Sequence, residues 1–321
     1  MSAAQLDTHR PVGRLAPSPT GRLHLGHARS FLIAWWHARS RGGSIVLRLE
    51  DLDVTRLREG SVAATIEDLR WLGLDWDGDP LLQSSDTVAM ETACAGLLAR
   101  GAAYACVCTR GEIRALSAPH ADEEEPRYPG TCRGKFDSLE HARRVSGREP
   151  ALRLCVPEGE LEITDGICGP RPFNVARDVG DIVLRRRDGA FAYQLAVVVD
   201  DARQGVNEVV RGDDLLPSAA RQWHVQRLLW LPRPRWWHVP LVQDEDGVRL
   251  AKRRDSTSLA ELRAEGVDPR AIVAWAARTC GLEPGRGASA SDLAAEFSMD
   301  RVPRGAVRLR AQDLAGLRLS R

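Results

Sequence analysis

Short apolar segments alternate with longer segments of helical periodicity over residues 11–103, and this alternation is the strongest constraint on the fold. Residues 12–16 (VGRLA) and 44–53 (SIVLRLEDLD) predict strands, whereas residues 25–43, 61–72 and 86–101 predict helices. Strands that alternate regularly with helices are typical of a parallel, doubly wound sheet. We therefore expect an α/β fold of the nucleotide-binding type.

The alternation stops near residue 104 and resumes near residue 190. We divide the chain into a first half of the α/β domain (1–103), an insertion (104–189), a second half (190–240) and a C-terminal part (241–321). Strands are expected at 151–156, 179–184, 191–202 and 208–212, and helices at 217–231, 259–266 and 269–280.

Composition excludes several classes of protein. The first 17 residues contain no apolar core of a signal peptide, and no run of 18 apolar residues occurs in the chain. Lys and Arg together number 45 against 44 Asp and Glu, so a contact with nucleic acid would have to use a local basic face. The 7 cysteines are not spaced as a disulfide framework, and we expect reduced thiols in a cytoplasmic protein.

Two histidines stand at the start of the first expected helix, in PSPTGRLHLGHARS (17–30). A helix N-terminus attracts anions, and His24 and His27, three residues apart, fall on one face of its first turn. Imidazoles in this position suit the charge that develops on a phosphate during in-line attack. The alternative is a helix that carries two surface histidines.

The segment RLAPSPTGRLHLGH resembles the first signature of class I aminoacyl-tRNA synthetases, in the form found in glutamyl enzymes. Further segments match that family in the same order, namely LRLEDLDVTR, FAYQLAVVVDDARQGVNEVVRGDDLL and VRLAKRRDSTSL. The resemblance covers about residues 12–260. It implies a Rossmann-type parallel sheet with a zinc-containing insertion and a small helical C-terminal subdomain.

The resemblance also implies a pocket for L-glutamate, lined by Arg14, Leu15, Ala16, Pro17, Ser18, Glu50, Tyr193 and Arg211. Two guanidinium groups and one carboxylate complement the two carboxylates and one ammonium of glutamate. Taken singly, Arg14 could be a surface residue, Glu50 a strand-end ion pair and Tyr193 a core residue.

For ATP, the resemblance implies His24, His27 and Lys252 as binding and catalytic residues, with Mg²⁺ accompanying the nucleotide. Lys252 is one of only two lysines, and it stands in the KMSKS-type loop, the second signature of the class. A lysine ammonium is a compact charge that suits phosphate groups. Ala251 occupies a position where related loops usually carry serine.

Cys106 and Cys108 form a C-x-C pair, and Cys132 follows about twenty residues later. Three thiolates suit a tetrahedral Zn²⁺ ion but leave one ligand open among Tyr128, His120, His141 and water. The resemblance implies Tyr128, because short glutamyl-type enzymes carry a Cys-x-Cys…Tyr-x₃-Cys zinc site. The alternative is three buried free thiols. The other cysteines are expected to be packing residues.

Only about 60 residues follow the Lys252 loop, too few for the helical anticodon-reading region of ordinary glutamyl-tRNA synthetases. The chain is therefore similar to the glutamyl-queuosine tRNA(Asp) synthetases, which activate glutamate with ATP and attach it to the queuosine base in the anticodon loop of tRNA(Asp). The implied partners are L-glutamate, ATP and queuosine-containing tRNA(Asp), bound by a monomer that does not contact membranes. The alternatives are a truncated glutamyl-tRNA synthetase that charges a tRNA 3′ end, a non-catalytic tRNA-binding protein and a small nucleotidyltransferase.

Overall fold

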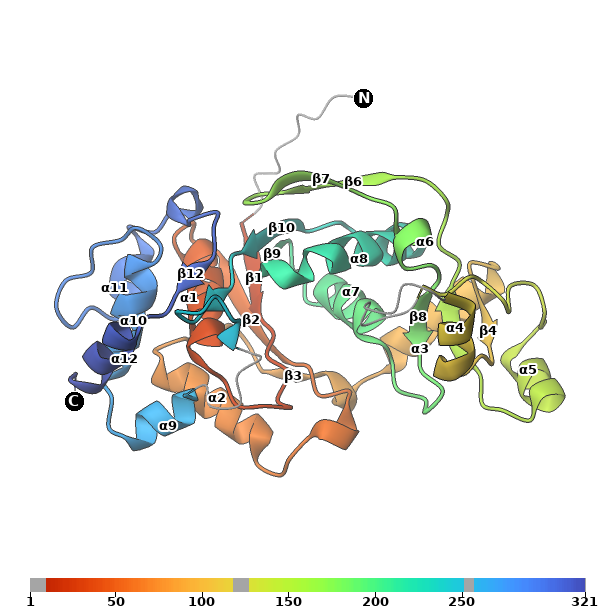
Figure 1. The fold of residues 1–321 in the computed structure, drawn as a ribbon, viewed down its shortest axis with the longest axis horizontal. Helices are drawn as coiled ribbons and strands as arrows, with labels where there is room; N and C mark the ends of the chain where they lie inside the picture. The colour runs from red at the N-terminus through yellow and green to blue at the C-terminus, as the bar shows by residue number, and fades with distance from the viewer. Residues whose placement is uncertain (1–9, 118–126, 251–256, 321) are drawn as a thin grey trace.

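The computed structural model describes residues 10–117, 127–250 and 257–320. Its centre is a mostly parallel sheet in two groups of strands (Figure 1). The first group is β1 (Val12–Leu15), β2 (Ser44–Leu49) and β3 (Leu81–Leu82), in that order and all parallel. The second has the order β7 (Gly169–Phe173), β6 (Leu161–Asp165), β10 (Arg235–Val239) and β9 (Glu208–Gly212). In it, β6 and β9 run parallel to β10, and β7 pairs with β6 in the antiparallel sense.

The two groups meet where β1 lies beside β9. The backbone N–H of Asn207, just before β9, donates to the carbonyl oxygen of Val12, and the Asn207 side chain accepts from the Val12 N–H at 2.8 Å. The sequence therefore folds into the parallel, doubly wound α/β arrangement that its alternating pattern predicts. The carboxyl ends of β1 and β9 come together at one edge, where such sheets bind ligands.

Helices connect the strands as the periodicity predicts. They are α1 (Leu25–Arg39), α2 (Ser61–Trp71), α3 (Val88–Ala99) and α8 (Leu216–Leu229). Helix α1 is the most deeply buried of these, and its Leu32, Ile33 and Trp36 are fully excluded from solvent. Burial on nearly all sides explains why α1 has only a weak apolar stripe.

The strand expected over residues 191–202 is wrong, because this segment forms helix α7 (Tyr193–Arg203). Consecutive residues from Leu195 to Val199 are all buried, so the segment has no polar face that would reveal a helical period. A short, continuously apolar run does not distinguish a buried strand from a buried helix. The two aspartates at its end, Asp200 and Asp201, are buried polar residues of the helix.

The middle of the chain contributes to two sheets. Strands β4 (Ala103–Cys106), β5 (Ala151–Leu154) and β8 (Ile182–Arg185) form a separate antiparallel sheet, near helices α4 (Arg110–Ser117) and α5 (Leu139–Ser146). The β6–β7 hairpin instead joins the central sheet through β10, and the short helix α6 (Val175–Asp178) follows it. This hairpin was not predicted from the sequence. Its outer strand contains Pro170 and Pro172, which suit an edge position because proline cannot donate a backbone hydrogen bond.

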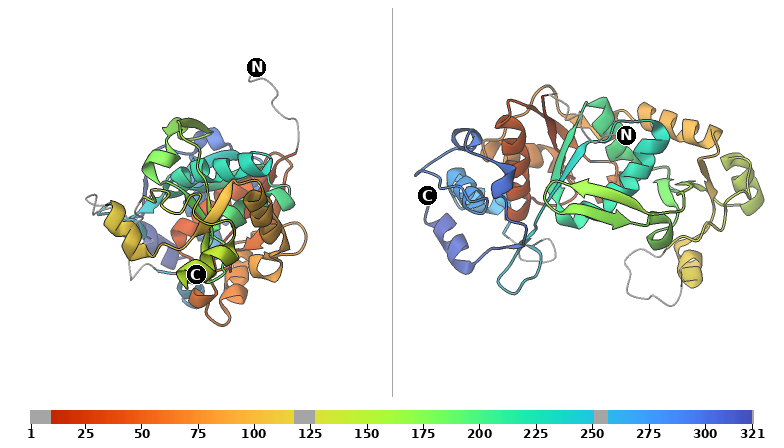
Figure 2. Two further views of the ribbon diagram at one scale, coloured as in Figure 1. Left: turned by 90° about the vertical axis from the view of Figure 1, so that its right-hand side faces the viewer. Right: turned by 90° about the horizontal axis from the view of Figure 1, so that it is seen from above.

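The C-terminal helices form a group beside α1 and α2 (Figures 1 and 2). They are α9 (Leu259–Ala264), α10 (Pro269–Arg278), α11 (Ala290–Ala294) and α12 (Ala311–Arg318), accompanied by the parallel pair β11 (Val242–Gln243) and β12 (Val307–Arg308). Trp36 of α1 stacks on Phe297 with ring centroids 5.6 Å apart and donates from its indole nitrogen to the Ala290 carbonyl oxygen. Helix α1 is thus covered by the sheet on one side and by α10 and α11 on the other, while α9 packs against α2 and α12 packs against α10. None of the helices in the described ranges has the length and apolar character needed to cross a membrane.

Candidate active site

A cavity of about 630 Å³ opens at the carboxyl ends of β1 and β9, beside the N-terminus of α1. Nine of the predicted glutamate and ATP residues line it: Arg14, Ala16, Pro17, Ser18, His24, His27, Glu50, Tyr193 and Arg211. Leu15 does not line it, because its side chain is fully buried in the hydrophobic core. Lys252 lies outside the described residues, although Arg249 and Leu250 line the cavity wall just before it.

The two histidines cap helix α1 reciprocally. His24 is the N-cap residue, and its Nδ1 accepts from the backbone N–H of Gly26 at 3.1 Å. His27 Nδ1 accepts from the backbone N–H of His24 at 3.3 Å. Because each Nδ1 is an acceptor, each neutral ring carries its proton on Nε2. Burial lowers the pKa of His24 to about 4, and burial together with His24 lowers the pKa of His27 to about 3. Both rings are therefore neutral Nε2–H donors near pH 7.

The chain that follows Lys252 returns to these histidines. Ser258 forms an antiparallel bridge with His24, and the backbone N–H of Leu259 donates to the carbonyl oxygen of Leu23 at 2.8 Å. Residues on both sides of Lys252 are consequently held near the N-terminus of α1.

Buried charges form the deeper wall of the cavity. Arg14 donates from Nη1 to the carbonyl oxygen of Val210 at 2.8 Å, and its Nε lies 3.8 Å from a carboxylate oxygen of Asp201. Arg14 Nε and His24 Nε2 are buried atoms that have no hydrogen-bond partner among the described residues. Since unpartnered buried donors are costly, their placement on the cavity wall favours an acceptor ligand at both positions.

Arg48 balances the carboxylates around the cavity. Its side chain is fully buried and donates to Asp201 at 2.7 Å and to Glu50 at 3.3 Å. Burial raises the pKa of Glu50, and the nearby cations Arg48 and Arg14 offset only part of this rise. The positive charge of Arg48 thus favours the carboxylate form of Glu50 at a position where burial favours the neutral form.

Arg211 occupies the opposite wall at the end of β9. It donates from Nη1 to the Tyr193 hydroxyl at 3.3 Å and from Nη2 to the carbonyl oxygen of Leu215 at 3.3 Å. Its Nε donates to Nε2 of the buried His238 at 3.0 Å. Tyr193 begins helix α7, so the unpredicted helix still delivers this side chain to the cavity.

The sequence prediction missed the groups that support these side chains. Arg48 and Glu50 are two residues apart at the end of a strand, and residues at this spacing point to the same side of a sheet. This spacing could have indicated the pair. Nothing in the sequence indicated His238 or its partner Asp165. The Asp165 carboxylate lies 2.6 Å from Nδ1 of His238, and this contact depends on the pairing of β6 with β10.

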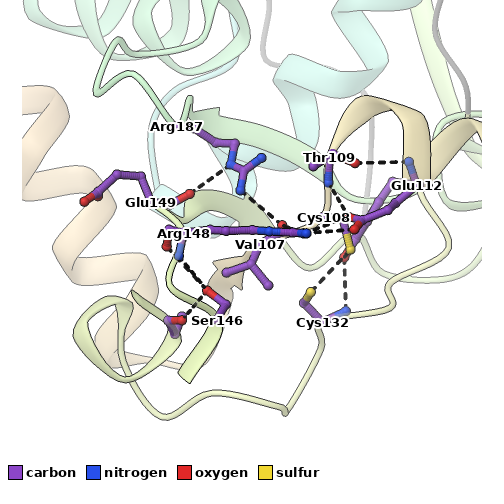
Figure 3. Close-up of polar contacts among 11 residues, drawn as sticks. Val107, Cys108, Thr109, Glu112, Cys132, Ser146, Arg148, Glu149 and Arg187 are labelled. Carbon is purple, nitrogen blue, oxygen red and sulfur yellow. Dashed lines mark hydrogen bonds and ion pairs between the residues drawn. The ribbon is translucent and has the colours of Figure 1, made fainter. Parts of the chain in front are cut away.

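The cysteine cluster lies about the end of β4, away from the cavity. The sulfur atoms of Cys106, Cys108 and Cys132 all lie within 4.8 Å of one another, with Cys108 and Cys132 3.5 Å apart (Figure 3). The Tyr128 hydroxyl lies 3.2 Å from the Cys106 sulfur and 3.6 Å from that of Cys108. Within the described residues His141 is not part of this group, and His120 lies outside those residues.

These four atoms fit a tetrahedral metal site. Zinc–sulfur bonds of about 2.3 Å place two sulfur ligands about 3.8 Å apart in a tetrahedron. Arg148 and Arg187 both donate to the carbonyl oxygen of Val107, between the two cysteines of the C-x-C pair (Figure 3). Arg153 lies over the ring of Tyr128, its guanidinium carbon 3.9 Å from the ring centroid. These arginine contacts thus hold the backbone of the C-x-C pair and the ring of Tyr128 in place.

The fold and the cavity define a class I tRNA synthetase catalytic domain. Residues 12–299 match the family model described as tRNA synthetases class I (E and Q), catalytic domain. The crystal structure of glutamate-tRNA synthetase from Elizabethkingia anophelis superimposes with a TM-score of 0.81 at 25% identity, covering 95% of this chain and 69% of that one.

Two curated relatives are more similar still, and both are named glutamyl-Q tRNA(Asp) synthetase. The one from Symbiobacterium thermophilum is 44% identical over 319 residues, which cover 95% of this chain and 98% of the relative. The one from Nocardia farcinica is 46% identical over 305 residues, which cover 95% and 94%. The chain belongs to the family of glutamyl-Q tRNA(Asp) synthetases.

Proposed function

We propose that this protein activates L-glutamate with ATP and transfers the glutamate to the queuosine base in the anticodon loop of tRNA(Asp). One observation carries the proposal: a single cavity contains both the residues expected for glutamate and the paired histidines expected for ATP. Membership of the glutamyl-Q tRNA(Asp) synthetase family supports the choice of acceptor.

The charges on the cavity wall complement glutamate. Arg14 and Arg211 supply guanidinium donors for the substrate carboxylates, and Glu50 accepts from its ammonium. Tyr193 orients the Arg211 side chain and adds a hydroxyl to the same wall. These groups are largely buried, which strengthens their interaction with a charged substrate.

In the first reaction, an oxygen of the glutamate α-carboxylate attacks the α-phosphorus of ATP. A carboxyl–phosphate bond forms, the bond from the α-phosphorus to the bridging oxygen breaks, and pyrophosphate leaves with the electron pair. The Nε2–H groups of His24 and His27 donate to the α-phosphate oxygens, where negative charge develops in the transition state. Positioning and electrostatic stabilisation supply most of the catalysis in such reactions.

Lys252 is assigned to the leaving phosphates. The neighbouring Arg249 and Leu250 line the cavity, and Ser258 pairs with His24, so the chain on both sides of the loop supports this role. Mg²⁺ bound with ATP would share the negative charge of the phosphates.

In the second reaction, a hydroxyl of the modified base attacks the activated carbonyl carbon. An ester bond forms and the hydroxyl loses its proton. The bond from the carbonyl carbon to the bridging oxygen breaks, and AMP leaves with that oxygen and the electron pair. Contacts with tRNA phosphates are expected to come from local arginines, since the net charge is only +1. Transfer should therefore weaken as the salt concentration rises.

We further propose that Cys106, Cys108, Tyr128 and Cys132 hold one structural Zn²⁺ ion in the insertion. Zinc with four protein ligands stabilises a fold without taking part in chemistry. The helices from α9 to α12 are assigned to a small C-terminal subdomain that packs against α1.

Glutamate-dependent exchange of labelled pyrophosphate into ATP tests the activation step. We expect exchange by the wild type without tRNA, and a fall of about 100-fold in kcat/KM for glutamate in Arg211→Met, since a buried charged partner is lost. The matched control is Arg143→Met, which removes an exposed arginine paired with Glu149 and should remain within about twofold of the wild type. A folded wild-type protein that supports no exchange would favour a non-catalytic binding protein.

A further inference from the structure

Three buried side chains form a line that leads from the cavity wall into the sheet. Arg211, on β9, donates from Nε to His238 Nε2 at 3.0 Å. His238, on β10, lies directly opposite Arg211 in the parallel ladder. Its Nδ1 lies 2.6 Å from a carboxylate oxygen of Asp165, the last residue of β6. The line therefore crosses three adjacent strands of the central sheet.

The Asp165 carboxylate fixes the tautomer of His238. It accepts from the backbone N–H groups of Ile167, Cys168 and His238. A carboxylate that accepts these bonds also accepts the His238 Nδ1–H, and the imidazole then presents a lone pair at Nε2. Burial lowers the pKa of His238, so the ring remains neutral beside Arg211. Burial alone would raise the pKa of Asp165. The hydrogen bonds that its carboxylate accepts, of which the one from His238 has the largest effect, outweigh burial and lower the pKa.

The acceptor at His238 determines which donors of Arg211 remain for a ligand. A guanidinium group has one N–H on Nε and two on each Nη nitrogen. Nε donates to His238, Nη1 to Tyr193 and Nη2 to the carbonyl oxygen of Leu215. Among the described residues, these contacts leave one donor on each Nη nitrogen. Two such donors match the two oxygens of a carboxylate.

We propose that His238, held by Asp165, is a positioning residue that fixes the guanidinium of Arg211 so that its two remaining donors bind a carboxylate of glutamate. The proposal rests on the proposed function, because it assigns the carboxylate of that substrate to Arg211. His238 is fully buried and is not among the residues that line the cavity, so it acts through Arg211. Without the acceptor for its Nε–H, the Arg211 side chain has more conformational freedom. Glutamate must then order this side chain when it binds, and the entropic cost weakens the affinity for glutamate.

Two amide substitutions of His238 separate its two contacts. The amide of asparagine reaches the position of Nδ1 and preserves the contact with Asp165, whereas the amide of glutamine reaches the position of Nε2 and preserves the acceptor for Arg211. In glutamate-dependent pyrophosphate exchange, we expect His238→Asn to raise the KM for glutamate about tenfold or more, with kcat and the KM for ATP changed less than about threefold. We expect His238→Gln to recover most of the glutamate KM.

His37→Asn is the matched control. His37 is also buried and also contacts a carboxylate, that of Glu208 at 3.2 Å, but it does not line the cavity. It should lose thermal stability without a change in the glutamate KM. Equal effects of His238→Asn and His238→Gln, or the same KM change in His37→Asn, would indicate a merely structural role and overturn the proposal. Absence of exchange in the wild type would instead count against the proposed function.

Nitrogen-15 NMR of the wild type provides a test that does not require a folded variant. The expected spectrum has a protonated Nδ1 and an unprotonated Nε2 for His238, and glutamate shifts the Arg211 Nε–H resonance. A His238 ring protonated at Nε2 cannot accept from Arg211, and this result would exclude the proposed contact.

Discussion

His24 and His27 stack face to face at the entrance to helix α1, with ring centroids 3.8 Å apart and planes inclined by 25°. Each ring satisfies a backbone N–H of the helix terminus through Nδ1 and keeps its Nε2–H for the cavity. Capping and the proposed phosphate contact are therefore made by opposite edges of the same imidazole.

Substitutions of His27 should separate these two roles. His27→Ala is expected to lower the rate of glutamate activation about 100-fold, because one preorganised donor to the transition state is lost. His27→Asn retains an acceptor for the backbone N–H of His24 and should be about as slow, whereas His27→Gln retains a donor near the position of Nε2 and should be faster than both. Single-turnover rates of adenylate formation measure the effect. A loss below threefold in His27→Ala would remove this histidine from the proposed role.

The low pKa values of the two histidines predict a loss of stability in acid. The folded pKa values are about 4 for His24 and about 3 for His27, whereas unfolded histidine titrates near 6.5. Between these values the unfolded chain binds more protons, so the free energy of unfolding falls as pH decreases below about 6.5. At pH 5 each histidine should contribute a loss of about 1–2 kcal/mol relative to pH 7. Urea unfolding of the wild type and of the His24→Gln, His27→Gln double variant measures this difference. An equal pH dependence in both proteins would show that neither histidine is held neutral.

Removal of Arg48 should affect both stability and glutamate binding. Arg48→Met leaves the buried carboxylates of Asp201 and Glu50 without their shared cation and should lower the free energy of unfolding by about 3–5 kcal/mol. It should also raise the KM for glutamate, since Glu50 then protonates more readily. The control is Arg39→Met. Arg39 pairs with the carboxylates of Asp75 and Asp77, which are at least half exposed, so its removal should lower the free energy of unfolding by about 1 kcal/mol or less. Similar losses in the two variants would contradict a buried charge network at position 48.

Much of this architecture is predictable from local patterns, and the remainder depends on long-range pairing. The strand–turn–helix of residues 12–39 has a clear apolar rhythm, and both histidines lie at the helix terminus that the rhythm predicts. Helix α7 was missed because burial on all sides removes the periodic polar face. The contact between His238 and Asp165 joins residues 73 positions apart, and only the tertiary pairing of β6 with β10 brings them together.

The proposed zinc site predicts metal content that depends on specific ligands. Purified wild-type protein should contain close to one zinc per chain, and less than about 0.2 in protein prepared without chelators would count against the site. Cys106→Ser should lose the metal and melt at a lower temperature, and Tyr128→Phe, which removes only the hydroxyl, should bind zinc more weakly. The control is Cys155→Ser, because Cys155 packs against this cluster without joining the three sulfur atoms. Full metal content in Cys106→Ser would exclude the assigned ligand set.

The central claim concerns the acceptor of the activated glutamate, and a transfer assay with labelled glutamate tests it most directly. Three tRNAs are compared under the same conditions: tRNA(Asp) that carries queuosine, tRNA(Asp) that lacks it, and tRNA(Glu). We predict label only on queuosine-containing tRNA(Asp). Label on tRNA(Glu), with none on queuosine-containing tRNA(Asp), would contradict the account and identify an enzyme that charges a tRNA 3′ end.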